Sequence, residues 1–579
     1  MNFLRVDMKR LTCRFEENKN YQGLAGRALT SQFIFNEVPA NAHPLGKENK
    51  LIFAPGYLTG TAAPCTGRFS VGGKSPLTRG IKESNSGGTS GQKLARMGID
   101  ALVIEGMPEQ KDTLYILHTS GRGAELIGAH ELRGLGNNDT VAQLTKTYGA
   151  AVGYMTLGQA GEMRLLTANI ATTDPENRPT RGARRGGLGA VMGSKGLKAI
   201  VVDDQGCEET TIREKEQFTK YAKEAIKAIM DNPLTGEALR AMGTSVMTAL
   251  VNSVGALPTQ NFRAGTFEGA EKLSGETLLD VTTKRGEQGR ENRRCCNGCP
   301  IACSRWWLNE KGERVGKRPE YEVIWSHGAN LLIDDPDAIV EMNELEADFG
   351  IDGMDTGMAL AVLMEAGIVE WGDARRCIEI VKEVGAGTYL GRIIGSGAEI
   401  TGRIFGVNRV SCSKGQSLSA YDPRISKGMG VTYATSPMGS DNTSGFCFPQ
   451  NCLSGEVPGG RPEGQAQLSF DAQVEAAAFD SVGLCALVGF HVSEGFPDYI
   501  VGMTNLKSGT SFGSLDELLK IGRDTLRTEF EFNRRSGISV SANRLPYFFY
   551  EEGIGEKGIR FDVPESDLDS LWEILSSGD

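Results

Sequence analysis

Residues 295–303 read Cys-Cys-Asn-Gly-Cys-Pro-Ile-Ala-Cys, and this stretch decides what the surrounding fold must hold. Within it, Cys296, Cys299 and Cys303 have the spacing C-x₂-C-x₃-C, which lets one tight loop present three thiolates to a single inorganic centre. Thiolates in this arrangement suit an iron–sulfur cluster, and a zinc ion is the alternative. Cys295 adjoins the motif; it is a spare in this register, but it could shift the ligand set by one residue.

A fourth thiolate is needed to complete such a site, and Cys485 is the best candidate. It ends the segment Asp480-Ser-Val-Gly-Leu-Cys485, about 180 residues after Cys303. A structural zinc site more often uses two paired motifs such as C-x₂-C. The distant fourth ligand therefore favours a cluster that joins two domains.

The bulk composition indicates a globular chain of several domains. Hydrophobic residues make up 40% and charged residues 23% of the 579 residues, which is ordinary for such proteins. The net charge of −11 argues against general binding of nucleic acid, because no basic excess exists to neutralise phosphates. The N-terminus lacks the apolar region of a signal peptide, and no run of 18 apolar residues occurs, so we expect a cytoplasmic protein without a membrane span.

Short β-type runs occupy the first third of the chain, and helical patterns follow. The runs at 51–53, 101–104, 113–117 and 199–202 are separated by Gly, Pro and Asn, whereas residues 210–230 have apolar side chains at helical spacing. Further helices are expected at 337–349, 357–367, 374–384, 472–479 and 515–532. The sequence thus predicts an α+β fold, with a β-rich base domain over residues 1–205. Two mainly helical domains would follow, 206–410 with the cysteine loop and 411–579 with the Cys485 segment.

Glycine is unusually frequent, with 75 residues gathered in short blocks rather than in repeats. One block, residues 184–198, contains G-x-G-x₃-G at Gly187, Gly189 and Gly193, but no apolar strand precedes it as in a dinucleotide fold. What remains is a glycine-rich basic loop whose amides and arginines could hold a phosphate. We therefore expect loops folded around a large cofactor.

Taken in order, the motifs resemble the tungsten- and molybdenum-containing aldehyde:ferredoxin oxidoreductase family. The matching segments, spread over nearly the whole chain, are GRFSVGGKSPLTRG followed by SNSGG, RRGGLGAVMGSKGLKAI, CNGCPIAC, RPEYEVIWSHGAN, DFGID, TSPMGSDN and DSVGLC. The resemblance implies a tungsten (or molybdenum) ion held by two pyranopterins on the β-rich domain, with a [4Fe–4S] cluster close by. It assigns the cluster to Cys296, Cys299, Cys303 and Cys485.

The same resemblance implies which residues contact the pterins. Arg68 resembles the arginine between cluster and pterin, Asp480 and Asp352 fall in the two pterin-recognition motifs, and the backbone at Asn85 and Gly186 resembles the phosphate and Mg²⁺ segments. The further contacts it implies are Lys74, Ser84, Ser86, Gly87, Gly88, Arg184, Arg185, Gly187, Leu188, Gly189, Asp348, Gly483 and Leu484.

Tyr321 and Glu322 resemble the pair beside the metal, where a carboxylate can act as general base. Asn442 stands where aldehyde-oxidising members have histidine, and an amide cannot carry a proton near neutral pH. His327 could supply the missing imidazole, against the ordinary interpretation of a structural histidine.

Two further departures concern the helical part. Ala347 occupies the leading aspartate position of the first pterin motif, with Asp348 as a substitute. The Glu-x-x-His of some members, which holds an iron between subunits, is absent, so a homodimer would need other contacts.

The expected function is oxidation of a small-molecule aldehyde to a carboxylic acid, with electrons passing to ferredoxin or an iron–sulfur subunit. One alternative keeps the fold in a low-potential reductase of the benzoyl-CoA reductase type, or an oxidoreductase with an atypical substrate. The other is a zinc-stabilised binding protein without redox function.

Overall fold

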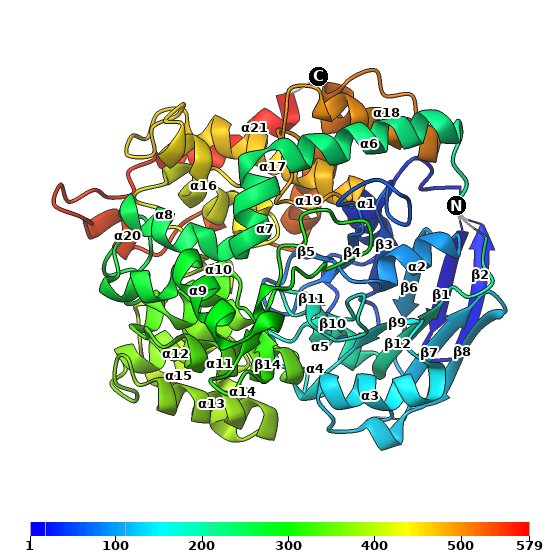
Figure 1. The fold of residues 1–579 in the computed structure, drawn as a ribbon, viewed down its shortest axis with the longest axis horizontal. Helices are drawn as coiled ribbons and strands as arrows, with labels where there is room; N and C mark the ends of the chain where they lie inside the picture. Colours follow the sequence, from blue (N-terminus) through cyan, green and yellow to red (C-terminus); the bar gives the residue numbers. More distant parts are fainter. Residues whose placement is uncertain (1, 18, 111, 209, 578–579) are drawn as a thin grey trace.

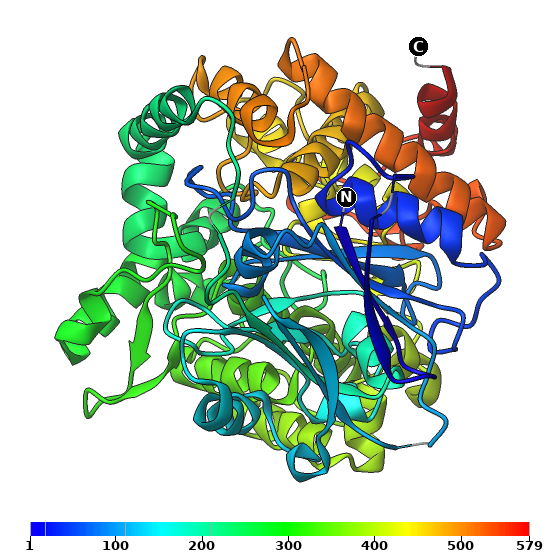
Figure 2. The same cartoon turned by 90° about the vertical axis from the view of Figure 1, so that its right-hand side faces the viewer.

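The computed structural model describes residues 2–17, 19–110, 112–208 and 210–577, and its first third is built on two six-stranded sheets (Figures 1 and 2). The first sheet runs β2 (Thr12–Glu17), β1 (Asn2–Asp7), β6 (Ala101–Glu105), β3 (Leu51–Pro55), β4 (Phe69–Lys74), β5 (Ile81–Ser86). The second runs β11 (Arg181–Ala183), β10 (Ile170–Thr172), β9 (Gly153–Thr156), β12 (Leu197–Asp203), β7 (Tyr115–Ser120), β8 (Gly123–Gly128). Both sheets are mixed, because β1 pairs with β6 and β12 with β7 in parallel while their other pairings are antiparallel.

The two sheets share one hydrophobic core. Phe53 and Phe69 of the first sheet pack in the same cluster as Ile200 and Val202 of the second, and all four side chains are fully buried. The helices of this part are α1 (Gly26–Glu37), α2 (Ser90–Arg96), α3 (Asn137–Tyr148), α4 (Gln159–Glu162) and α5 (Leu188–Ser194). The central strands β3, β4 and β12 are buried along nearly their whole length, which leaves the connecting loops to form binding surfaces.

After β12 the chain is mainly helical. Its α-helices are α6 (Lys215–Asp231), α7 (Leu239–Met242), α8 (Met247–Ser253), α9 (Gly275–Arg285), α10 (Tyr321–His327), α11 (Pro336–Phe349), α12 (Gly353–Glu365), α13 (Ala374–Ala386), α14 (Tyr389–Ile394), α15 (Ala398–Phe405), α16 (Lys427–Thr435), α17 (Gln465–Val482), α18 (Phe496–Ser508), α19 (Leu515–Arg535), α20 (Phe548–Glu551) and α21 (Glu565–Ser577). Two small hairpins interrupt them, β13–β14 (Trp306–Leu308 with Arg314–Lys317) and β15–β16 (Cys412–Ser413 with Gln416–Ser417).

The predicted α+β architecture is confirmed, and local signals explain several helix limits. For α11, Asp335 caps the first turn by accepting from the amides of Asp337 and Ala338, and Gly350 ends the helix at φ +76°. Helix α17 is much longer than the predicted 472–479, because polar side chains such as Gln465, Ser469 and Gln473 occupy buried positions and hide the buried face from an apolar pattern. The domain divisions after residues 205 and 410 remain predictions; the first falls between β12 and α6.

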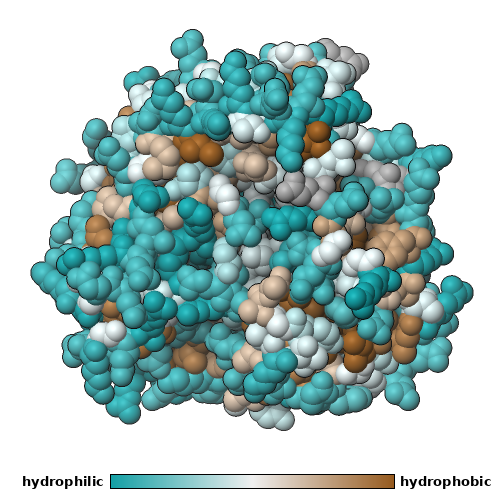
Figure 3. All heavy atoms as spheres, turned by 45° about the vertical axis from the view of Figure 1, so that its right-hand side comes forward, coloured by the Kyte–Doolittle hydropathy of each residue, from teal (hydrophilic) through white to brown (hydrophobic). Residues whose placement is uncertain are grey.

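Helix α1 connects the β-rich part to the C-terminal helices. Its fully buried Arg27 forms ion pairs with Glu529 of α19 at 2.8 Å and with Asp480 of α17 at 3.4 Å. An unpaired charge at such a depth would be costly, so the pairs fix how these segments dock. In Figure 3 the visible face is mostly hydrophilic with small separate apolar patches. No helix in the described part of the chain is long and apolar enough to cross a membrane.

Candidate functional site: a cavity between the sheets and the helices

A cavity of about 300 Å³ lies where strand β5, the loops flanking β11 and the helical part meet. It brings together segments that are more than 400 residues apart in sequence. The predicted residues that line it are Arg68, Ser84, Asn85, Gly87, Arg184, Arg185, Cys303, Glu322, Asp352, Asn442, Asp480 and Cys485. This one cavity therefore unites the glycine-rich blocks, the cysteine loop and the candidate base.

The cysteine loop lies at one end of the cavity. Cys303 and Cys485 line it directly, while Cys296 and Cys299 are buried behind them. Burial raises the pKa of the Cys303 thiol to about 12. Among the described residues no group of three or more Cys, His, Asp or Glu side chains is arranged to hold a single metal ion.

Two other cysteines that the ligand prediction did not use lie beside this group. Cys295 Sγ is 3.8 Å from Cys296 Sγ, and Cys65 Sγ is 3.8 Å from Cys299 Sγ. Cys65 comes from the loop after β3, far from the cysteine loop in sequence. The donors gathered here are all thiols, the ligand chemistry that iron–sulfur clusters use.

Arginine side chains with uncommitted donors surround the cavity. Nε of Arg68, Arg181 and Arg184 and Nη2 of Arg318 are buried, and none has a hydrogen-bond partner among the described residues. Burial and the neighbouring Arg305 lower the pKa of Arg318 to about 9. Buried guanidinium nitrogens without a partner call for an acceptor, and the anionic pterin phosphates have that chemistry.

The loop between β11 and α5 makes a tight turn behind the cavity lining. Gly186 and Gly187 have φ of +77° and +75°. A Cβ at Gly187 would lie 2.1 Å from the Leu166 carbonyl oxygen, and a Cβ at Gly186 would lie 2.6 Å from the Lys82 side chain. Glycine is therefore needed at both positions for the turn to pack against Leu166 and Lys82.

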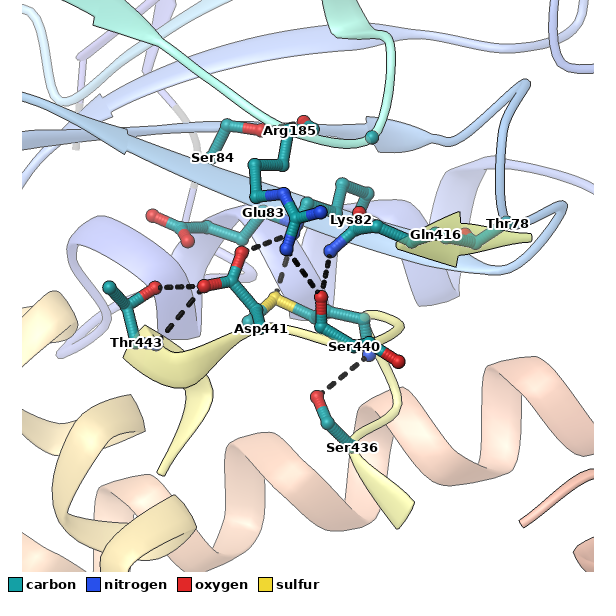
Figure 4. Close-up of polar contacts among 12 residues, drawn as sticks. Thr78, Lys82, Glu83, Ser84, Arg185, Gln416, Ser436, Ser440, Asp441 and Thr443 are labelled. Atoms are coloured by element: carbon teal, nitrogen blue, oxygen red, sulfur yellow. Dashed lines mark hydrogen bonds and ion pairs between the residues drawn. The ribbon is translucent and has the colours of Figure 1, made fainter. Parts of the chain in front are cut away.

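Arg185 is committed to protein partners instead. Its guanidinium pairs with Asp352 at 3.3 Å and Asp355 at 3.5 Å and donates to the carbonyl oxygens of Ser440 and Ser417, each at 2.7 Å. Figure 4 shows Arg185 and Lys82 pointing from the β-rich part toward the loop that carries Ser440 and Asp441. Asp352 faces the cavity from the start of α12, where it also caps the helix.

A buried ion pair that sequence reasoning missed lies next to this contact. Lys82 Nζ is 3.8 Å from Asp441 Oδ2, and both side chains are almost fully buried (Figure 4). Asp441 in turn accepts from the amide and the hydroxyl of Thr443, at 3.0 and 2.8 Å. The pair ties strand β5 to the loop that presents Asn442.

The candidate base is a buried carboxylate. Burial is the main reason that the pKa of Glu322 is raised to about 7; Glu320 and Asp441 raise it further, whereas hydrogen bonds from its own amide and from Asn442 lower it. Asn442 Nδ2 donates to Glu322 Oε1 at 3.2 Å, and Asn442 Oδ1 is buried without a partner among the described residues. A carboxylate near neutral pKa beside a free amide oxygen can take a proton from, and orient, a bound hydroxyl group.

Two further carboxyl groups share the cavity wall. Burial raises the pKa of Glu83 to about 8 and that of Asp480 to about 6. The negative charge of the nearby Asp480 also contributes to the raised pKa of Glu83. Arg27 offsets part of this effect. A protonated Glu83 and an ionised Asp480 present both a donor and acceptors to a polar heterocycle.

Several predicted site residues lie outside the cavity lining. The hydroxyl of Tyr321 donates to the Ala420 carbonyl oxygen at 2.8 Å, and His327 is fully buried between Glu346, at 2.8 Å, and Ser326, at 2.9 Å. The Asp348 carboxylate accepts from the Asn138 amide at 2.8 Å in the first turn of α3. Lys74 donates to the Ala40 carbonyl oxygen. The structure thus gives these four side chains structural partners, and their expected roles stay predictions without a contact in the cavity.

The remaining predicted contacts form the shell behind the lining. The Gly186 carbonyl oxygen accepts from Ser75 Oγ at 2.7 Å, and the expected Mg²⁺ at Gly186 and Asn85 stays a prediction. Ser86 Oγ donates to the Gly87 carbonyl oxygen, and Gly483 packs against Thr59 and Arg68. The other members of this shell are Gly88, Gly187, Leu188, Gly189 and Leu484.

The missed residues had weak but readable signals. Lys82 and Glu83 stand between the two quoted glycine-rich blocks as adjacent charges in a short strand, and Asp441 directly precedes Asn442. Arg318 directly precedes the Pro-Glu-Tyr-Glu segment. Cys65 lies three residues before Arg68 and had no motif spacing to mark it.

Comparisons with known proteins cover nearly the whole chain. The family described as "Aldehyde ferredoxin oxidoreductase, N-terminal domain" matches residues 3–204, and "Aldehyde ferredoxin oxidoreductase, domains 2 & 3" matches residues 220–574. The chain is 34% identical to the "Tungsten-containing aldehyde ferredoxin oxidoreductase" of Thermococcus kodakarensis, over 96% of this chain and 92% of the relative. It is 33% identical to the protein of the same description from Pyrococcus horikoshii, with the same coverage.

A solved structure is similar over its whole fold. It is described as "Active site complex BamBC of Benzoyl Coenzyme A reductase in complex with 1,5 Dienoyl-CoA". The TM-score is 0.79 with 18% identity, covering 100% of this chain and 94% of the other. At 18% identity, this similarity shows only that the two proteins share a fold.

Proposed function

The chain belongs to the aldehyde ferredoxin oxidoreductase family, as its ordered motifs predicted, and from this premise we propose that it oxidises an aldehyde to a carboxylic acid at a tungsten (or molybdenum) bis-pyranopterin. Electrons would leave through a [4Fe–4S] cluster to ferredoxin or an iron–sulfur partner subunit. In this reaction the aldehyde gains the oxygen of one water and releases two electrons and two protons.

One observation carries the proposal: a single cavity is lined by the carboxylate of Glu322 and by the thiols of Cys303 and Cys485. The proton acceptor and the expected electron exit therefore bound the same space. A binding protein without redox function needs neither group there. The uncommitted donors of Arg68, Arg181 and Arg184 support the pterin phosphates in the same cavity.

The residues present fit the expected cofactors. Cys296, Cys299, Cys303 and Cys485 would hold the cluster, and the arginines together with the Gly186–Gly187 turn would hold the phosphates. Asp480, Asp352 and Glu83 would hydrogen-bond the pterin rings. When bound, the metal supplies two-electron oxidation and the cluster supplies one-electron transfer.

The protein's own side chains would handle the proton. Glu322 in its ionised form takes a proton from the water or hydrated aldehyde, because its pKa of about 7 places the carboxylate near the working pH. Asn442 holds Glu322 with its amide nitrogen and has its oxygen free to accept from the same substrate hydroxyl. Burial of the Asn442 side chain restricts bulk water around the base.

Anaerobic purification followed by metal analysis tests the proposal. About four iron atoms and one tungsten or molybdenum per chain are expected, together with viologen-linked oxidation of members of an aldehyde panel. Zinc alone in the purified chain would overturn the proposal and leave the binding-protein alternative.

A low-potential reductase is the second candidate. The observation that favours it is Asn442, because an amide cannot move a proton as the family's histidine can. Full metal content without oxidation of any aldehyde, but with oxidation of a strong viologen reductant by a thioester of an aromatic acid, would select this function.

A further inference from the structure

Residues 65–68 pack directly against the cysteine loop. A Cβ at Gly67 would lie 2.7 Å from Cys296 Sγ, and the Cys485 amide donates to the Cys65 carbonyl oxygen at 2.9 Å. The Arg68 amide donates to the Gly483 carbonyl oxygen at 3.3 Å, two residues before Cys485. This short segment therefore contacts the loop ligands and the distant fourth ligand at once.

Cys65 is the residue of this segment that directs a sulfur at the group. Its side chain is 1% exposed, and its Sγ lies 3.8 Å from Sγ of Cys299. Its φ of +59° is in the left-handed region that residues other than glycine seldom adopt. The hydrogen bond from Cys485 holds the backbone in that conformation, and the conformation sets the direction of the thiol.

We propose that Cys65 is a positioning residue for electron transfer, whose S–H group donates a hydrogen bond to the Cys299 sulfur and raises the reduction potential of the cluster. The inference rests on the proposed [4Fe–4S] cluster and gives a role to a thiol other than the four ligands and Cys295. It concerns a side chain of the β-rich part, whereas the four predicted ligands all lie in the helical part.

The direction of the effect follows from charge. Reduction adds one negative charge to the cluster and its thiolates, and a hydrogen bond to a ligand sulfur stabilises that charge. A donor at Cys65 therefore favours the reduced form. The cluster becomes a readier acceptor of electrons from the cavity side.

Cys65 is surplus as a ligand. A four-iron cluster takes one protein thiolate per iron, and Cys296, Cys299, Cys303 and Cys485 already supply that number. The S–H group of a cysteine that is not bound to iron is a weak hydrogen-bond donor. Its contact with a single ligand sulfur fits this role.

The experiment compares Cys65→Ala and Cys65→Ser in the complete, metal-loaded protein. Both variants keep the Cβ, so the strained backbone of residue 65 is unchanged. We expect full iron content in both. In an EPR-monitored redox titration, the midpoint potential should shift downward in C65A and by a smaller amount in C65S, whose hydroxyl can still donate.

Cys377→Ala is the matched control, because Cys377 is also fully buried but lies in α13, in a different hydrophobic cluster. Its potential should equal that of the wild type. An unchanged potential in iron-loaded C65A would overturn the inference alone. Loss of iron in both C65A and C65S would also overturn it, since Cys65 would then be a ligand. A wild-type protein without iron would overturn the proposed function as well.

Discussion

Asn442 Nδ2 donates a hydrogen bond of 3.2 Å to Glu322 Oε1 across 120 residues of sequence. The contact joins the loop after α16 to the first turn of α10 and leaves the other amide atom of Asn442 facing a buried site without a partner. The base and its neighbour therefore act as one unit, with one end fixed and the other free for substrate.

Replacing Glu322 by Gln should reduce kcat by about 10²–10⁴-fold, the usual contribution of a positioned acid–base group. Gln has the same shape and can still bond Asn442, so the iron and tungsten content should stay at the wild-type level. The exposed Glu370→Gln serves as control and should retain full activity. Wild-type kcat in E322Q would remove Glu322 from the mechanism.

The pH profile of kcat/KM should rise through about pH 7 as Glu322 loses its proton. In Asp441→Asn this acidic limb should move to lower pH. Asp441 raises the pKa of Glu322, so removing its negative charge lowers that pKa. A limb that moves upward in D441N would contradict this electrostatic coupling.

Asn442→Ala should move the same limb in the opposite direction. The hydrogen bond from Asn442 stabilises the ionised form of Glu322, so its loss raises the pKa of that carboxyl. Rates measured from pH 5 to 9 in both variants separate the two effects. If both limbs shift the same way, general disruption of the loop explains them better.

Cys485→Ala should lower the iron content well below four per chain and abolish the visible absorption of the cluster. Removal of one thiolate leaves one iron without a protein ligand. C377A again provides the control, because it removes a buried thiol that is remote from the loop. Iron content equal to wild type in C485A would exclude Cys485 as the fourth ligand.

Gly187→Ala should lower the free energy of unfolding by about 2–4 kcal/mol, because the left-handed backbone disfavours a Cβ and the Leu166 carbonyl oxygen would lie 2.1 Å from it. Gly134 has the same φ of +75° with no atom within 4 Å of its Cβ position. G134A should therefore cost only about 1–2 kcal/mol. If calorimetry gave equal losses of unfolding free energy for G187A and G134A, the close approach of the Gly187 Cβ position to the Leu166 carbonyl oxygen would not contribute to stability.

Much of the architecture could be read from the sequence because it is encoded locally. Short apolar runs separated by Gly, Pro and Asn marked β3, β6, β7 and β12, and apolar side chains at helical spacing marked α11. The first turns of helix α17 were missed because polar side chains occupy several of its buried positions. Local patterns report which face of a segment is buried, but not what lies against it.

Within the site, too, some features could be predicted from the sequence and others are set by packing. Spacing singled out the cysteine loop, and the family resemblance added Glu322 and Asn442; the fold brings these residues and Cys485 to one region around the cavity. The sequence also proposed His327 and Asp348. In the fold, His327 hydrogen-bonds Glu346, and Asp348 accepts from the Asn138 amide of helix α3. Both residues have suitable chemistry, and only packing decides which direction they face.

By itself the sequence determined the fold class, the thiol ligand set as a prediction and the family, because residue type and spacing are written along the chain. Only the tertiary structure decided that Cys65 meets Cys299, 234 residues away, and that Lys82 meets Asp441. Such contacts form where the β-rich part docks on the helices. Their partners are chosen by the packing of whole surfaces, which no local stretch of sequence specifies.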